Sequence, residues 1–336
     1  MRVPAEEGGE ATADEEGTAA VGDPAAGAGR GPKGKGGPEA RGWRQDAGRV
    51  GVWLNSALAA EDPSELAAGI ERLGFGALWL GGGNADETAF ARVRQALAGT
   101  SRLVVATGIT SIWAWEAPAL ARLVGSIEEE FPGRFLLGLG VSHAPLVRSL
   151  GRRYERPLEA MSSFLGELAQ ASSEGQAAAP VVLAALGPRM LELARDSSAG
   201  AHPYLTTPAH TARARQVLGS SPFLAPEQAV VLEQDPARAR STARAHLSRY
   251  LRLSNYRRNL LDLGYGEEEL AGEGSDRLVD EIVAHGSPGQ VAHRVSAHLA
   301  AGADHVCIQP LGQATTAERL DALEQLAPLL LGRPRA

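Results

Sequence analysis

From Arg49 onward, short apolar runs alternate with segments whose apolar residues recur at helical spacing. The stretch from Arg102 to His143 shows this pattern clearly: Leu103–Ala106 and Phe135–Val141 are apolar runs typical of strands buried on both faces. Between them, helical spacing begins near Pro118 and ends before a Pro-Gly pair. Two parallel strands of one sheet require such a crossover, so this stretch predicts a βαβ unit.

The same alternation continues to the end of the chain and predicts eight strands, each followed by a helix. The predicted strands are residues 50–55, 76–81, 103–106, 135–141, 181–186, 200–206, 228–235 and 303–312. A long helical insertion, from Pro236 to about His285, follows the seventh strand. Eight strands, each followed by a helix, predict an α/β fold: a (β/α)₈ TIM barrel with a helical insertion after strand seven.

In such a barrel the ligand site lies at the carboxyl ends of the strands. Gly108 and Gly140 put bare backbone at this edge, at or beyond the ends of the third and fourth strands. After the fifth strand, small residues precede a helix whose free N–H groups and dipole favour an anion: Ala184, Ala185, Leu186, Gly187 and Pro188. A tight turn that binds no ligand remains an equal alternative.

Composition and charge narrow the class of protein. With 44% hydrophobic and 22% charged residues the chain has an ordinary globular composition, and a net charge of −7 without a dense basic cluster argues against a nucleic-acid partner. No apolar run reaches the roughly 18 residues of a membrane span, so a cytoplasmic protein is expected. The single cysteine, Cys307, excludes an internal disulfide and is expected to fill core space.

Residues 1–48 differ in composition from the rest. Sixteen of them are Gly or Pro, and few are large and apolar. Because such a segment cannot bury enough surface to offset its ordering entropy, we expect a disordered extension over 1–48 and one barrel domain over 49–336. A binding arm is the alternative.

The expected barrel mouth is poor in reactive side chains. Both lysines lie in the extension, which excludes Schiff-base chemistry in the barrel. Glu233 and Asp235 after strand seven, with His143 after strand four and His202 in strand six, are too sparse for a metal-dependent hydrolase, so no metal site is expected. Such a mouth takes its chemistry from an organic cofactor or performs none.

Two tryptophans and two histidines allow further interpretations. Trp113 and Trp115 follow the third strand, where they could stack on a flat ring or pack a loop. His293 and His298 are five residues apart on a helix and do not share a face, so we expect surface residues rather than ligands.

Six motifs in order resemble the bacterial luciferase-like superfamily, in particular its actinobacterial branch of coenzyme F420-dependent oxidoreductases. They are ATGITSIWAWEAPALA, FPGRFLLGLGVSHAPLV, AALGPRMLELA, AGAHPYLTTPAHT, PEQAVVLEQDP and AGADHVCIQPL. The resemblance runs from about Arg49 to the C-terminus. It implies a barrel with an insertion after strand seven, usually homodimeric, that binds coenzyme F420 or FMN at the carboxyl end.

The resemblance also implies roles for individual residues. Gly108 and Ile109 match the position of a non-prolyl cis peptide that backs the cofactor ring, and Val141 and Ser142, beside Gly140, match loop positions next to the cofactor. Residues 184–188 match the segment whose amides hold the cofactor phosphate.

The chain also departs from the family pattern. The acidic and histidine pair that some relatives carry after strand two has no counterpart here. His143 occupies the position of a catalytic glutamate in a sugar-phosphate dehydrogenase branch, which makes it our catalytic candidate and argues against sugar-phosphate oxidation.

The expected function is therefore transfer of a hydride between coenzyme F420 and a small organic substrate. Two alternatives remain open: an FMN-dependent monooxygenase on the same barrel, and a cofactor-binding barrel without catalytic activity.

Overall fold

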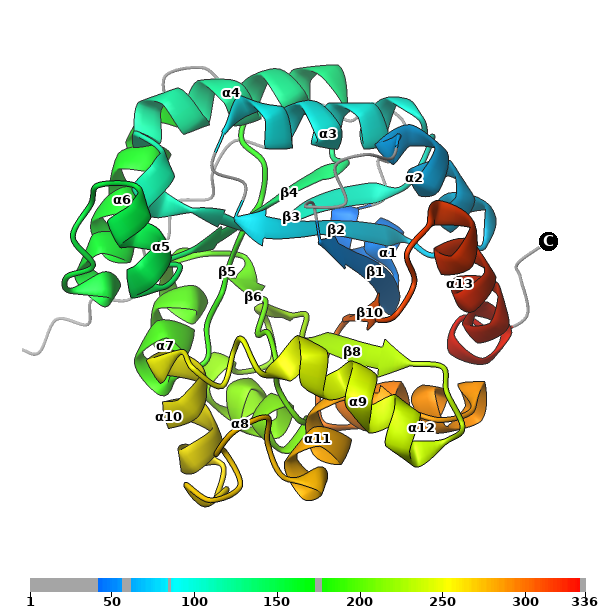
Figure 1. Ribbon diagram of the computed structural model, residues 1–336. Coiled ribbons are helices and arrows are strands. Elements are labelled where there is room, and N and C mark those ends of the chain that lie inside the picture. Colours follow the sequence, from blue (N-terminus) through cyan, green and yellow to red (C-terminus); the bar gives the residue numbers. More distant parts are fainter. Residues whose placement is uncertain (1–41, 56–61, 84–85, 173–176, 333–336) are drawn as a thin grey trace, which may run out of the picture. The chain divides into compact units, whose positions relative to one another are not determined.

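A computed structural model describes residues 42–55, 62–83, 86–172 and 177–332, and these form an α/β unit built on one parallel sheet (Figure 1). The order of the ten strands is β7-β6-β5-β4-β3-β2-β1-β10-β8-β9. Their bounds are β1 Val50–Asn55, β2 Ala77–Gly83, β3 Val104–Ser111, β4 Phe135–Gly140, β5 Val181–Leu183, β6 Gly200–Ala201, β7 Phe223–Leu224, β8 Glu227–Val231, β9 Ala284–His285 and β10 Val306–Pro310.

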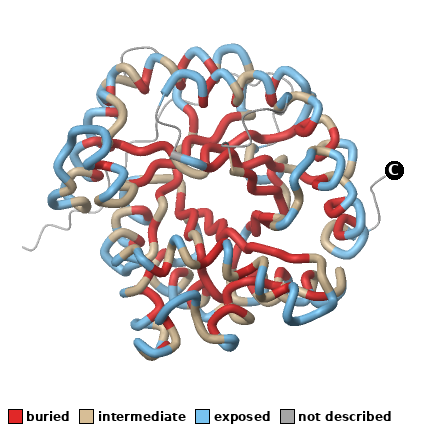
Figure 2. The backbone as a smooth tube through the Cα atoms, viewed as in Figure 1, coloured by how far each residue is buried: buried red, intermediate tan, exposed pale blue. Residues whose placement is uncertain are grey.

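Helices surround the sheet, and buried residues follow the strands and the helix faces turned toward them (Figure 2). The α-helices are α1 Trp43–Ala47, α2 Pro63–Arg72, α3 Glu87–Ala98, α4 Ala117–Glu130, α5 Ala144–Ser149, α6 Pro157–Ser172, α7 Pro188–Ser197, α8 Pro208–Leu218, α9 Pro236–Leu247, α10 Ser254–Asp262, α11 Asp276–Ile282, α12 Pro288–Ala300 and α13 Thr316–Leu330, with a 3₁₀ turn at Ile112–Ala114. No helix in the described ranges has the length and apolar character needed to cross a membrane.

The sheet is curled, because β7 at one end and β8 near the other are separated only by Ala225 and Pro226. This short link contacts both sides: the Ala225 N–H donates to Ala201 at 2.9 Å, and the Pro226 carbonyl accepts from the Cys307 N–H at 3.0 Å. The predicted α/β class with a curled parallel sheet is therefore confirmed.

Some predicted boundaries are wrong. The seventh strand was expected to begin at Gln228, but the pairing starts at Phe223 and is broken at Pro226, which has no N–H to donate. The fifth and sixth strands are shorter than expected, and β9 was not expected at all.

Helix α1 lies inside the stretch that we expected to be disordered. The Trp43 ring packs edge-on against Phe223, with 4.9 Å between centroids, and Arg44 donates to the carbonyls of Ser221 and Ala199. These contacts tie residues 42–48 to the sheet, so the described fold begins at Gly42. The remainder of the predicted extension, residues 1–41, lies outside the described residues.

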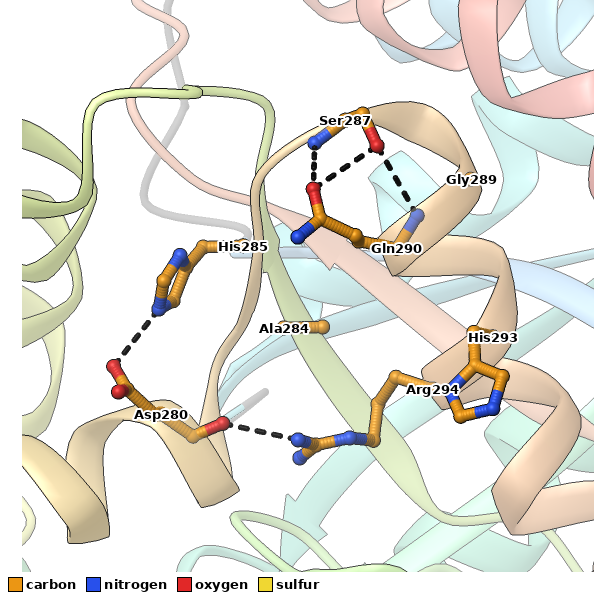
Figure 3. A pocket seen from close by; sticks show the side chains of 8 residues that line it. All are labelled: Asp280, Ala284, His285, Ser287, Gly289, Gln290, His293 and Arg294. Carbon is orange, nitrogen blue, oxygen red and sulfur yellow. Dashed lines mark hydrogen bonds and ion pairs between the residues drawn. The ribbon is translucent and has the colours of Figure 1, made fainter.

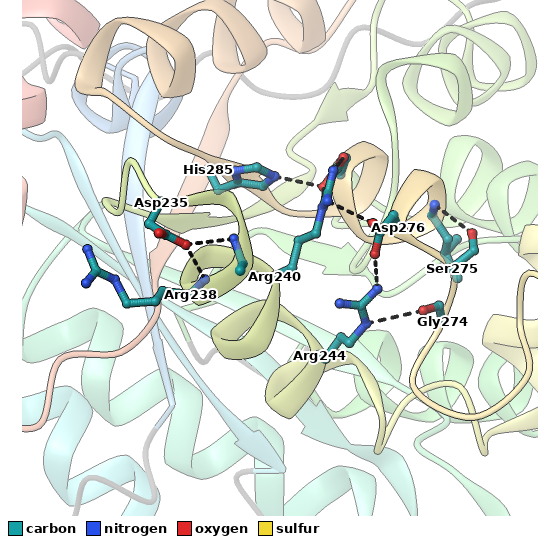
Figure 4. A network of polar contacts seen from close by, with 11 residues as sticks. Asp235, Arg238, Arg240, Arg244, Gly274, Ser275, Asp276 and His285 are labelled. Atoms are coloured by element: carbon teal, nitrogen blue, oxygen red, sulfur yellow. Dashed lines mark hydrogen bonds and ion pairs between the residues drawn. The ribbon is translucent and has the colours of Figure 1, made fainter.

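Helices α9 and α11, from the long segment after β8, are tied to each other and to β9 by ion pairs (Figure 4). Arg240 binds Asp280 at 2.6 Å and Asp276 at 2.8 Å, and Arg244 also binds Asp276. His285 of β9 meets Asp280 at 2.8 Å. The segment is helical, as the sequence predicts, and these pairs fix it beside the sheet.

Candidate active site

Three of the segments predicted for the site meet at the carboxyl edge of β3, β4 and β5, which are neighbours in the sheet. A Cβ placed on Gly140 would lie 2.5 Å from Cδ1 of Ile109 and 3.2 Å from Cβ of Ala184. The end of β4 therefore touches the ends of both adjacent strands, and Gly140 serves to admit the Ile109 side chain.

The peptide between Gly108 and Ile109 is cis, at the position that the resemblance implies. Pairing between β3 and β4 shifts register here, between Ala106 and Thr110. The Thr107 hydroxyl compensates for the shift, because it accepts from the Gly138 N–H at 2.8 Å and donates to the Gly138 carbonyl at 2.9 Å. Gly108 and Ile109 remain half-exposed at the mouth.

The loop after β4 is held by a tryptophan. Trp113 donates from its indole nitrogen to the Val141 carbonyl at 2.8 Å, and Ser142 adopts a left-handed backbone conformation with φ of 56°. Trp115 packs edge-on against Phe90. Both tryptophans thus pack the loop, the second of the two interpretations given above.

His143 lies half-buried at the start of α5, with its ring 5.4 Å from that of Tyr256 on α10. Burial lowers the pKa of His143 below its usual 6.5, although a hydrogen bond to the Asn255 side chain acts in the opposite direction, so the ring is mostly neutral at pH 7. Its Nδ1 atom has no partner within the described part of the chain. A neutral imidazole with a free nitrogen can exchange a proton with a ligand.

The loop after β5 leads into α7 with its backbone open. Gly187 is the exposed N-cap, followed by Pro188, and a Cβ on Gly187 would meet nothing within 4 Å. The Leu186 carbonyl accepts from Nε2 of His210 at 2.9 Å, which fixes the loop from the side of α8. Ala185 is buried in the core, so only its backbone is available to a ligand, whereas Ala184 is half-exposed.

Sequence reasoning missed a cation at this loop. Arg189, the second residue of α7, is exposed beside Gly187 and adds positive charge to a helix start. Its position directly after the Gly-Pro pair was a signal that the sequence offered.

The two carboxylates expected at the mouth after strand seven do not converge on the site. Asp235 caps α9 by accepting from the N–H groups of Ala237 and Arg238, and Glu233 forms an ion pair with Arg238 at 2.8 Å. Both side chains therefore bind neighbouring residues of α9 and do not point to a shared site.

The structure adds a polar network that sequence reasoning did not find. Tyr204, beyond β6, donates its hydroxyl proton to Oε1 of Gln309 at 2.8 Å and lies 3.1 Å from the Tyr250 hydroxyl. Nε2 of His246 is 3.4 Å from the Tyr204 oxygen. These residues come from three distant parts of the chain, and only the position of Tyr204 near the carboxyl end of the predicted sixth strand could have suggested the network.

Inside the curled sheet lies a buried carboxyl group that was also missed. Glu227 is 1% exposed; its Oε2 atom accepts from the Leu205 N–H at 3.3 Å, and Oε1 has no partner among the described residues. Burial raises the pKa of Glu227 to about 8, so at neutral pH the group is mostly protonated. It lies just outside the predicted seventh strand, which begins at Gln228.

His298, expected at the surface, is buried. Its Nε2 atom lies 3.0 Å from Oε1 of Gln228, and its Nδ1 atom lies 2.8 Å from the Thr211 hydroxyl. The prediction was wrong because both partners of His298 come from distant segments. The spacing between His293 and His298 in the sequence says nothing about those partners.

A cavity of about 450 Å³ lies away from these residues, beside β9 and α12 (Figure 3). Its polar groups are bonded to one another: His285 to Asp280, Arg294 to the Asp280 carbonyl, and Ser287 to Gln290. Within the described ranges no group of three or more His, Cys, Asp or Glu side chains could hold a metal ion.

Comparison with known proteins gives a family match. The sequence model of the luciferase-like monooxygenase family matches residues 46–305. A 5,10-methylenetetrahydromethanopterin reductase from Methanolobus tindarius is 26% identical over 149 residues, which is 39% of this chain and 46% of that protein. The chain thus matches less than half the length of this relative.

Two of the solved structures that resemble the fold illustrate the range of cofactors. An F420-dependent secondary alcohol dehydrogenase, in complex with an F420-acetone adduct, superposes with a TM-score of 0.65 at 14% identity, covering 84% of this chain and 99% of that one. The oxygenating constituent of 3,6-diketocamphane monooxygenase from Pseudomonas putida, with FMN, gives a TM-score of 0.62 at 14% identity, covering 85% and 99%. At these identities the likeness concerns the fold.

Proposed function

The chain belongs to the luciferase-like monooxygenase family, and we propose that it is an oxidoreductase that transfers a hydride between coenzyme F420 and a small organic substrate. The matched reductase and the dehydrogenase that resembles the fold support this choice, because the latter acts with F420. The resemblance of the six motifs points to the same cofactor.

One observation carries the proposal: the contact between Gly140, Ile109 and Ala184, which brings three strand ends together at the carboxyl edge. There the bare backbone of Gly140 lies against the side chains of Ile109 and Ala184, which together form a floor. A flat cofactor ring needs such a floor, and a side chain on Gly140 would displace Ile109 from it.

The phosphate of the cofactor would lie at the start of α7. Gly187 presents exposed backbone with open space around it, and Arg189 adds a positive charge. The helix dipole favours an anion at this point. His210 stabilises the arrangement through its hydrogen bond to the Leu186 carbonyl.

Bound F420 would supply a carbon that accepts or donates a hydride. The chain supplies placement and a water-poor surrounding. Trp113 holds the Val141 carbonyl, and the rings of Tyr204 and Tyr250 pack against each other beyond β6. We propose His143, neutral and with a free Nδ1 atom, as the group that exchanges a proton with the substrate.

Titration of the purified protein with F420 and with FMN, followed by fluorescence, tests the cofactor. We expect F420 to bind at least about tenfold more tightly than FMN. If FMN alone binds, and the reduced protein consumes oxygen, the monooxygenase alternative replaces the proposal.

Gly187→Val tests the phosphate position. The residue has φ of −80° and open space, so the fold should lose no more than about 1 kcal/mol of unfolding free energy. A valine side chain should crowd the anion and weaken F420 binding about tenfold or more, while a dephosphorylated analogue loses little. Gly187→Ala should show a smaller effect in the same direction, and equal losses for the two ligands would contradict the assignment.

On finer points of architecture, we propose that β7 and β8 count as one interrupted strand, which gives a (β/α)₈ barrel whose insertion follows the seventh strand. We also propose that residues before Gly42 form a separate extension, and that the protein acts in the cytoplasm as a homodimer.

A further inference from the structure

A half-buried guanidinium beside β9 has no anionic partner among the described residues. Arg294, on α12, donates to the carbonyl of Asp280 at 3.0 Å and to that of Glu281, and it forms no ion pair within the described ranges. Burial lowers the pKa of Arg294 more than the nearby carboxylates raise it. Because charges removed from water are normally paired, this position requires an explanation.

The two nearby carboxylates are already bound elsewhere. Asp280 accepts from Arg240 at 2.6 Å and 2.9 Å and from His285 at 2.8 Å. These bonds, chiefly those from Arg240, hold the pKa of the Asp280 carboxyl below its usual 3.8, so the group stays charged. The Glu281 side chain forms an ion pair with Arg277 at 3.1 Å. The guanidinium on α12 therefore keeps a positive charge that no described carboxylate neutralises.

This charge lies at the cavity of about 450 Å³, a size within the range of pockets that hold small organic molecules (Figure 3). Three side chains of α12 line it: Gln290, His293 and Arg294. The capping box of Ser287 and Gln290 already satisfies the start of α12, so the donors open to a ligand are side chains.

Each of these three side chains keeps N–H groups that no described residue accepts. The Gln290 oxygen accepts from the Ser287 N–H at 2.8 Å, which leaves its amide nitrogen for a ligand. Two N–H groups of Arg294 bind carbonyls, and a guanidinium has others. His293 is exposed. The lining therefore offers hydrogen-bond donors together with a positive charge.

We propose that this cavity binds a small carboxylic acid in its anionic form, at a site separate from the proposed cofactor site. A carboxylate presents two oxygens to the planar fork of Arg294, and further oxygens of the same molecule can accept from Gln290 and His293. One negative charge matches the one positive charge that Arg294 leaves unbalanced. A phosphate dianion has the same oxygen chemistry but exceeds that charge, so the test includes it.

The test uses the ¹⁵N-labelled full-length protein without cofactor, titrated with acetate in exchange for chloride and, separately, with acetamide. The two molecules have nearly the same size, and only acetate is charged. The amide signal of Gly289, which lines the cavity and is assigned with Gly289→Ala, reports occupancy. We expect a saturable shift with acetate and at least about tenfold weaker binding of acetamide. Equal responses to the two molecules would overturn the proposal.

Phosphate, titrated in the same way, distinguishes the two kinds of anion. We expect it to bind more weakly than acetate. If phosphate binds more tightly, the assignment to a carboxylic acid is wrong.

Two variants test the residues. Arg294→Gln should weaken acetate binding about tenfold or more. Because Arg294 also bonds carbonyls of α11, His293→Glu gives a second test that does not disturb packing: it places a negative charge on an exposed side chain of the lining and should weaken binding about threefold or more.

Ala300→Glu is the matched control for His293→Glu. Ala300 is exposed on the same helix, about 10 Å further along its axis, which exceeds the Debye length at physiological salt. This variant should leave acetate binding within about twofold of the wild-type value. If both glutamates weaken binding to the same extent, acetate does not bind in the cavity and the proposal fails.

A competition experiment separates this site from the proposed function. Acetate should not displace F420, and neither glutamate variant should change the affinity for F420. Displacement would place acetate in the cofactor site and overturn the proposal. Failure of F420 to bind at all would remove the proposed function without altering the acetate titrations.

Discussion

Glu227→Gln is expected to remove a contribution to stability that falls as the pH rises from 6.5 to 8.5. The Glu227 carboxyl is fully buried, and burial raises its pKa to about 8, whereas in the unfolded chain it returns to about 4.5. The folded protein therefore keeps a proton that the unfolded chain releases. Stability from this group is fully present below pH 4.5 and falls as the pH rises toward 8.

Linkage gives a loss on the order of 2 kcal/mol in the contribution of Glu227 between pH 6.5 and 8.5. Glutamine has the same shape, can accept from the Leu205 N–H and does not ionise, so its unfolding free energy should not follow this slope. Urea unfolding at pH 6.5, 7.5 and 8.5 measures the difference.

Buried histidines dominate the opposite side of the pH profile. Burial lowers the pKa of His202 and His305 to about 4, and of His246 and His298 to about 3. The unfolded chain binds protons at these groups near pH 6.5, so their contribution is lost as the pH falls below that value. The histidine contribution is common to the wild-type protein and Glu227→Gln, so the difference between their two pH profiles isolates Glu227.

Exposed Glu192, on α7, provides the control: Glu192→Gln should keep the wild-type slope. If the slopes of the wild-type protein and Glu227→Gln are parallel, Glu227 does not titrate in this range.

The parts of the fold that could be predicted are those that depend on residues close together in the sequence. The sequence pattern predicted both ends of β1 and of α8 correctly. A buried strand and a capped helix each have a recognisable pattern of residues over consecutive positions. It failed at Phe223, where a two-residue strand, an interruption at Pro226 and a second strand have no regular repeat. It failed also at α1, whose burial depends on Phe223, 180 residues away in sequence.

The candidate site likewise has a part that could be predicted from the sequence and a part that could not. The loops after β3, β4 and β5 could be located because glycines and helix starts mark strand ends, and the structure brings them into contact. Glu227, Tyr204 and Tyr250 could not be assigned, because their state depends on neighbours from distant segments. A buried carboxyl group has no sequence signature of its own.

Gly138→Ala is expected to be among the most destabilising single-methyl changes in the curled sheet. A Cβ at Gly138 would lie 1.9 Å from the Thr107 carbonyl oxygen and 3.3 Å from Cγ2 of Ile109. The first contact is with backbone, which cannot turn away as a side chain can. The added methyl group must push β3 from β4 where the Thr107 hydroxyl replaces the sheet hydrogen bonds.

We expect a loss of about 3 kcal/mol or more in urea unfolding, above the usual range for overpacking because both strands are central. Gly166→Ala, in α6 with nothing within 4 Å, is the matched control and should be neutral or stabilising by up to about 1 kcal/mol. Thr107→Val then separates the two contributions, since it removes the hydroxyl that Gly138 bonds without adding bulk. If Gly138→Ala unfolds like the wild-type protein, the strands can move apart at no cost, and the floor proposed for the cofactor is not rigid.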